Sequence, residues 1–219
     1  MGTTVTEIPE AQRLSLAHAP AGHRGQWLAF FSLDHALGRI VAGTSEAILG
    51  QMRLAWWRDQ LGAPIETRPK GNPILSNISE FWAGYEKPLI ELVDSWELLL
   101  VTDVMDDGAL ESFAQGRVAP FKALAKRANS ACHKSLIANA ARCWALTDLS
   151  LHLSDTDGRK NVQRLVKEHT QVNGALDRSM RPLTILEGLS VRALKQGRTS
   201  LVGDRLSPLF ALRLGIFGR

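Results

Sequence analysis

Apolar residues recur at helical spacing along most of this chain. The first stripe starts near Gln26, and a second helix is predicted to begin at Thr44 or Ser45 and to run to about Leu61. In this second helix we expect four apolar side chains to point inward: Ile48, Leu49, Met52 and Trp56. The glycines and prolines of residues 62–73 then indicate one long loop.

The same periodicity continues to the end of the sequence. Asp106 or Asp107 is expected to cap a helix that Pro120 ends or kinks. The other helices are predicted near residues 74–85, 88–101, 121–153, 160–178 and 181–196. Strand signals are nearly absent, because the chain has one Tyr and no sustained alternation of apolar and polar residues. The sequence therefore predicts an all-α, single-domain helical bundle.

We divide the chain into three parts on these patterns. Residues 1–22 are expected to be a flexible N-terminal segment, residues 23–200 the helical domain, and residues 201–219 a basic and apolar C-terminal tail. The tail mixes leucines and phenylalanines with three arginines, so it either lies on anionic lipid or packs back onto the domain. No transmembrane segment and no secretory signal are predicted.

Charge is unevenly distributed along the chain. Residues 1–110 hold 8 Lys/Arg and 14 Asp/Glu, a net charge of −6, whereas residues 111–219 hold 18 and 8, a net charge of +10. The basic half is typical of a protein with an anionic partner, such as a diphosphate or a lipid headgroup, and equally of an ordinary solvated surface. No nucleic-acid-binding module is predicted, because the aromatic residues are interleaved with apolar residues rather than with Lys and Arg.

Several common catalytic signatures are missing. The sequence has no Walker A or GxGxxG loop, no CxxC and no HExxH. Its two cysteines, Cys132 and Cys143, are expected to be free thiols in a reducing cytoplasm.

One segment carries a family resemblance. The run FFSLDHALGRIVAGTSEAILGQMRLAWWRDQL, residues 30–61, resembles the opening of squalene/phytoene synthases, which join prenyl diphosphates head to head. In that family a first helix bears a DDxxD-type motif and the next ends in a Trp-Arg signature, which RLAWWRDQL resembles. The resemblance implies a helical bundle of the isoprenoid synthase type. It also implies a prenyl cavity lined by residues that include Phe30, Leu33, Leu37, Phe113 and Gly116.

The acidic motif itself is lost. Alignment on Phe30 and Phe31 places residues 38–42, GRIVA, on the DDxxD, so Gly38, Arg39 and Ala42 stand where carboxylates would bind Mg²⁺. Arg39 would repel Mg²⁺ but could contact a diphosphate, and it joins three other candidate ligand-binding residues: Arg53, Trp57 and Arg58. Asp34, one turn earlier, is interpreted as a solvent-facing residue.

The second acidic motif of the family is matched only in part in this sequence. Asp148, His152 and Asp155 fall at i, i+4 and i+7, so they share one helix face that could hold a metal ion. Asp155 could instead cap the next helix. No catalytic residue is assigned, and no cofactor is expected unless these residues bind Mg²⁺ in an active transferase.

Three functional hypotheses follow. The first is a non-catalytic, cytoplasmic protein that binds a prenyl chain, a lipid or a partner protein. It rests on a resemblance to a divergent branch of the family that includes a mitochondrial respiratory complex I assembly factor, in which the acidic motifs are likewise eroded. Such a protein would be peripheral on the inner membrane. The second is an active prenyl transferase of isoprenoid biosynthesis, and the third is a helical adaptor without a small ligand. The eroded motif favours a protein that is not an enzyme.

Overall fold

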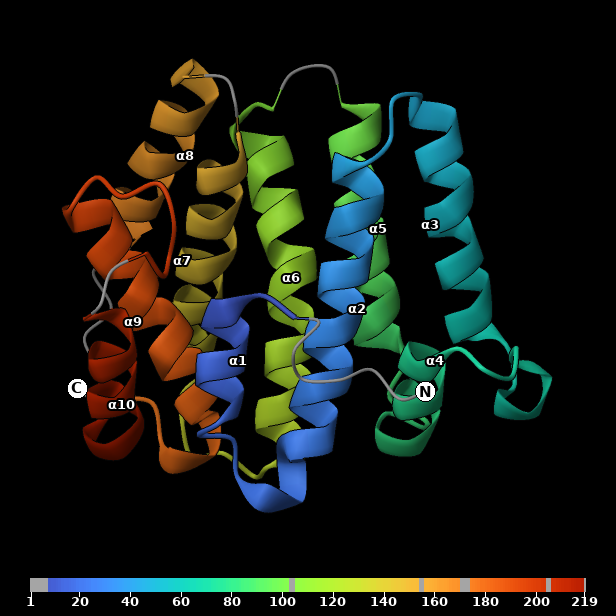
Figure 1. Ribbon diagram of the computed structural model, residues 1–219, viewed down its shortest axis with the longest axis horizontal. Helices are drawn as coiled ribbons and strands as arrows, with labels where there is room; N and C mark the ends of the chain where they lie inside the picture. The colour runs from blue at the N-terminus through green and yellow to red at the C-terminus, as the bar shows by residue number, and fades with distance from the viewer. Residues whose placement is uncertain (1–7, 103–104, 154–155, 170–173, 204–205, 219) are drawn as a thin grey trace. The chain divides into compact units, whose positions relative to one another are not determined.

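The computed structural model describes residues 8–102, 105–153, 156–169, 174–203 and 206–218. In these residues the chain forms ten α-helices and three short 3-10 helices, and no strand (Figure 1). The all-helical prediction is therefore confirmed for the described chain. The helices belong to two compact units, one comprising residues 1–9 and 22–123 and the other residues 10–21 and 124–219.

The first unit contains α2 to α5 and most of α6. Its helices are α2 (Arg24–Ala42), α3 (Ala47–Gly62), α4 (Pro73–Phe81), α5 (Lys87–Val101) and α6 (Asp107–Arg127), with 3-10 helices at Ala21–His23 and Ile65–Thr67. Helix α2 packs against α3, α4 and α5, and α3 packs along α5. As predicted, Asp106 caps α6, because its side chain accepts a hydrogen bond from the Ala109 amide at 2.8 Å.

Aromatic side chains of α2 and α6 form the core of this unit. Phe121 of α6 lies edge-on to Phe30, with ring centroids 5.0 Å apart, and 5.7 Å from Trp27. Phe31 contacts both Trp27 and Phe30. All four side chains are almost completely buried, so the aromatic start of α2 is a packing element.

The predicted orientation of α3 was wrong. Ile48, Leu49, Met52 and Trp56 are between 38% and 64% exposed, and the inward side consists of Gly50, Leu54, Trp57 and Leu61. Both sides of this helix are apolar, so periodicity alone did not separate them. Gly50 decides the orientation, since a Cβ at this position would lie 2.5 Å from a methyl carbon of Leu100 in α5. The side of α3 that carries Gly50 is therefore the one that approaches α5.

Two further helix boundaries differ from the prediction. Helix α6 continues through Pro120 to Arg127, because the neighbouring Val118 and Phe121 are buried in the core and outweigh one missing backbone hydrogen bond. The chain then turns at Asn129, whose φ is 49°. The amide of Ser130 donates to the Ala125 carbonyl, which closes a Schellman motif and separates α6 from α7.

The second unit contains the remaining helices. They are α1 (Glu10–Leu16), α7 (Lys134–His152), α8 (Thr156–His169), α9 (Arg181–Lys195) and α10 (Ser207–Phe217), with a 3-10 helix at Arg178–Met180. Helix α1 lies within the segment predicted to be flexible, and it is helical because it packs on α9 and α10. Helix α8 begins at Thr156, before its predicted start near Lys160, and residues 174–177 lie outside any helix. None of the helices in the described ranges combines the length and apolar character needed to cross a bilayer.

Candidate functional site

A buried ion pair lies one helical turn before the segment that the family resemblance aligned with the acidic motif. Asp34 of α2 and Arg117 of α6 are 2% and 1% exposed. Arg117 donates from Nε to Asp34 Oδ1 at 3.1 Å and from its terminal nitrogen to Oδ2 at 2.7 Å. The Trp96 indole of α5 also donates to Asp34 Oδ1, at 2.9 Å. Asp34 thus connects α2, α5 and α6 through buried hydrogen bonds, and it is not the solvent-facing residue that was predicted.

Aromatic rings complete the surroundings of Arg117. Its guanidinium lies 5.2 Å from the Trp96 ring centroid and 5.6 Å from that of Phe113, and the two rings meet edge to face. The cation is therefore compensated by a bidentate carboxylate and by two π faces. Sequence reasoning missed Arg117, although an arginine among buried apolar residues of one helix was a signal for it.

Gly38 supports the same arrangement from α2. A Cβ at this position would lie 3.0 Å from the Trp96 ring, so glycine lets the indole approach the helix and reach Asp34. Arg39 and Ala42 are exposed. Gly38, one of the three positions aligned with acids, is thus a residue that the contact between Trp96 and Asp34 needs.

The predicted cavity residues have two different environments. Phe30, Leu33, Leu37 and Phe113 are each 0% exposed within the helical core. Gly116 instead lies where α6 meets α5, since a Cβ there would be 2.3 Å from the Ser95 Cβ. The four large side chains therefore act as core packing.

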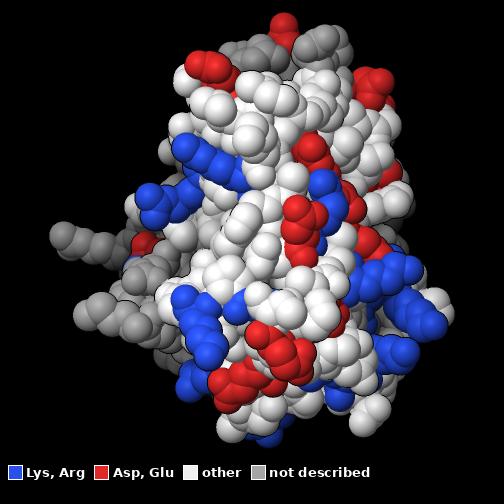
Figure 2. Space-filling view, turned by 90° about the vertical axis from the view of Figure 1, so that its right-hand side faces the viewer, with Lys and Arg blue, Asp and Glu red and all other residues white. Residues whose placement is uncertain are grey.

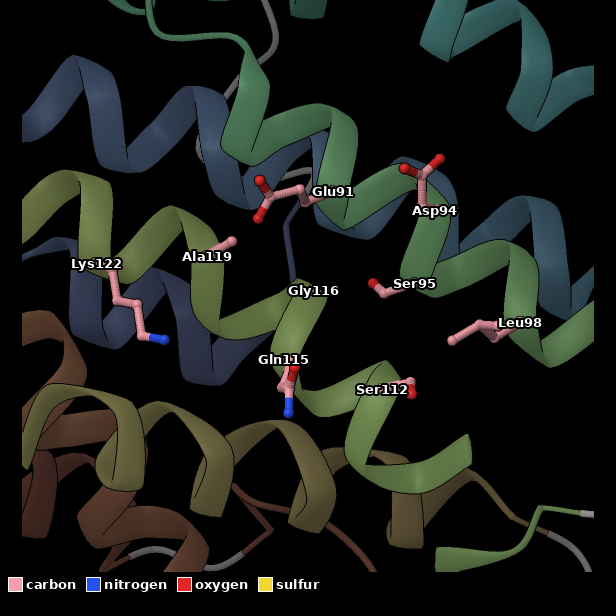
Figure 3. Close-up of a pocket in the computed structure, with 9 residues that line it drawn as sticks. All are labelled: Glu91, Asp94, Ser95, Leu98, Ser112, Gln115, Gly116, Ala119 and Lys122. Atoms are coloured by element: carbon pink, nitrogen blue, oxygen red, sulfur yellow. The ribbon is translucent and has the colours of Figure 1, made fainter. Parts of the chain in front are cut away.

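Gly116 also lines a pocket of about 370 Å³ on the outside of α5 and α6. Figure 3 shows its nine lining residues, which come from these two helices: Glu91, Asp94, Ser95, Leu98, Ser112, Gln115, Gly116, Ala119 and Lys122. Its walls carry carboxylates, hydroxyls, an amide and a lysine, with few apolar side chains. None of the four large apolar side chains predicted to line a prenyl cavity is among the residues that line this pocket.

The arginines of the Trp-Arg signature are not brought together around one anion. Arg53 is exposed, whereas Trp57 is buried and meets Trp56 edge to face at 5.0 Å. Arg58 binds Asp94 at 2.7 Å and also Glu97, both on α5. The hydrogen bond to Glu97 is the main cause that raises the pKa of Arg58 above its ordinary value. Arg58 thus ties α3 to α5.

The candidate metal ligands are divided. Asp148 and His152 lie on α7, where His152 Nδ1 is 2.7 Å from the Asp148 carbonyl oxygen, and Asp155 lies outside the described residues. Within the described ranges, no three His, Cys, Asp or Glu side chains gather in a way that could hold a metal ion.

The outer face of α3 carries a row of exposed apolar side chains. Ile48, Met52 and Trp56 follow one another at i, i+4 and i+8, with Leu49 and the exposed Arg53 beside them. Figure 2 views the side on which α3 lies, where uncharged surface runs between acidic and basic side chains. We call these five residues the α3 face.

Comparisons with protein-family models, with curated proteins and with solved structures find no match to this chain.

Proposed function

We propose that this chain is a non-catalytic protein of squalene/phytoene synthase type that binds a partner protein, as an assembly factor does, instead of turning over a prenyl diphosphate. The observation that carries the proposal is the Asp34–Arg117 pair. Ionisation of an allylic diphosphate needs carboxylates that are open to Mg²⁺. Here both oxygens of Asp34 accept hydrogen bonds from Arg117, and Trp96 adds a third.

The donor set at this centre does not fit a Mg²⁺-diphosphate site. A cation already neutralises the carboxylate, and Gly38 lies against Trp96 where the alignment expects an acid. Removing Arg117 to make room would leave the buried Asp34 carboxylate without its counter-ion. We therefore derive no chemical step through a metal.

The α3 face supports binding as the activity. Large apolar side chains rarely stay exposed in a contiguous stripe unless something covers them. Methionine and tryptophan beside an arginine are typical of the centre of protein interfaces. Glu46, just before α3, and Asp59 on it are both exposed, and they add negative charge that suits a partner protein better than an anionic lipid surface.

The test replaces two exposed residues of the α3 face. The wild type is first used to capture its partner protein from cells of the source organism. We expect the double variant with Ile48→Gln and Met52→Gln to lose this partner. These side chains are 59% and 64% exposed, so the unfolding midpoint should stay unchanged. Binding must then be reproduced with the purified partner. A matched control combines Leu209→Gln and Ile216→Gln, which are similarly exposed on α10, at 61% and 58%, and should keep the partner. Equal binding by all three proteins would contradict the proposal.

A further inference from the structure

Helix α10 exposes its apolar residues rather than hiding them. Ser207, Ala211 and Leu214 are buried, whereas five large apolar residues are between 46% and 67% exposed: Leu206, Leu209, Leu212, Ile216 and Phe217. On a helical wheel at about 100° per residue, Leu209, Leu212 and Ile216 share one side, with Leu206 and Phe217 at its edge. We call these five residues the α10 face.

Close contacts hold the opposite side of α10 in place. A Cβ at Gly188 of α9 would lie 2.3 Å from a methyl carbon of Leu214. A Cβ at Gly215 would lie 2.0 Å from the His18 ring that follows α1. Both glycines therefore let helices approach closely, and α10 is seated on α9 and α1 within its unit. The α10 face is consequently a fixed outward surface.

The chain around this face is mainly basic. Residues 205–219 contain three arginines and no Asp or Glu, and residues 174–219 contain eight Lys/Arg against three Asp/Glu. Arg213 is exposed within the same arc of the helix as Leu206 and Leu209. Its guanidinium lies 5.7 Å from the Phe210 ring, and that of Arg192 lies 5.1 Å from the same ring. Basic groups therefore border the apolar surface.

We propose that the α10 face binds the surface of a bilayer that contains anionic lipid. At about 1.5 Å per residue, the 11 residues of α10 span about 16 Å, roughly half of a hydrocarbon core of about 30 Å. The helix therefore lies parallel to the membrane, with its leucines and Phe217 among the acyl chains. Arg213 extends to the headgroup phosphates. This membrane site goes beyond the partner-binding function proposed for the α3 face and does not depend on it.

Charge distinguishes the two exposed apolar faces. Glu46, just before α3, and Asp59 on α3 are exposed together with Arg53, so the exposed charge there is net negative and an anionic bilayer would repel it. Helix α10 contains no acidic residue, and attraction to anionic lipid adds to the burial of its apolar side chains. The α3 face is thus the matched control for an experiment on α10.

The test is flotation of the purified full-length chain with vesicles. One set contains phosphatidylcholine alone, and the other contains phosphatidylcholine with a minority of phosphatidylglycerol. We expect the wild type to float with the anionic vesicles and to be released in part by high salt. Combining Leu209→Gln and Ile216→Gln should weaken binding by about tenfold or more, and Arg213→Gln by about fivefold. The control pair Ile48→Gln and Met52→Gln should bind as the wild type does.

Three results would overturn the proposal. The first is a wild type that stays unbound on anionic vesicles. The second is an α10 pair variant that floats like the wild type. The third is a wild type that is dimeric by light scattering while the α10 pair is monomeric, which would make the face a contact between copies. Circular dichroism checks that the variants are folded. If the α10 pair variant is unfolded, the Arg213→Gln variant decides, and its binding to anionic vesicles as strongly as the wild type would reject the proposal. The proposed partner function would fail separately, through the α3 pair.

Discussion

At the scale of single residues, the Asp34–Arg117 pair is the feature whose loss should cost most. Asp34→Ala would leave a buried guanidinium without its carboxylate, and we expect a loss of about 3–5 kcal/mol in the free energy of unfolding. Replacing both partners, with Asp34→Leu and Arg117→Met, should recover part of that loss, because no charge remains buried although the Trp96 indole N–H loses its acceptor. Urea denaturation of the wild type and of the two variants measures the loss in the free energy of unfolding and its recovery. A double variant as unstable as Asp34→Ala would contradict this account.

Glu187 on α9 provides a prediction about pH. Burial raises the pKa of its carboxyl from an ordinary value of 4.5 to about 6. The stability that this group contributes is therefore complete below pH 4.5 and is lost as the pH rises through 6. Glu187→Gln should accordingly raise the free energy of unfolding at pH 8 by about 1–2 kcal/mol more than at pH 4. Urea midpoints at the two pH values test this, and a mutational effect independent of pH would argue against it.

At the scale of elements, the approach of α5 to α6 depends on Gly116. A Cβ there would lie 2.3 Å from the Ser95 Cβ and 2.6 Å from the Glu91 carbonyl oxygen. Because backbone cannot move aside cheaply, Gly116→Ala should lower the free energy of unfolding by about 1–3 kcal/mol. Gly62→Ala in α3 is the matched control, since nothing lies within 4 Å of its Cβ position. The control should leave the thermal midpoint unchanged or slightly raised. A similar loss of stability in both variants would show that lack of room for a Cβ at Gly116 is not the cause.

The helices themselves were largely predictable from the sequence, but their orientation and partners were not. Apolar spacing located α2, α3, α5 and α9 to within a few residues, because local periodicity and caps determine where a helix forms. Helix α3 has apolar residues on both sides, so only its contact with α5 at Gly50 reveals which side is inward. The site depends on residues 83 positions apart, Asp34 and Arg117, and no local pattern joins such residues.

At the scale of the whole molecule, two exposed apolar faces of opposite charge character suggest a division of roles. The α3 face, bordered by Glu46 and Asp59, is proposed to bind a protein, and the α10 face, bordered by arginines, to bind anionic lipid. Each rests on different residues and can fail without the other. The acidic first half and the basic second half of the chain are in line with this proposed division.

The central claim is that the chain binds rather than catalyses, and its turnover of prenyl diphosphates tests this most directly. The wild type is incubated with farnesyl or geranylgeranyl diphosphate and Mg²⁺, with a squalene synthase that has intact acidic motifs as the positive control. Mass spectrometry then measures released diphosphate and any lipid that the protein retains. We expect diphosphate release no greater than without protein, because Arg117 and Trp96 engage the Asp34 carboxylate. Release that depends on both Mg²⁺ and the protein would contradict the account.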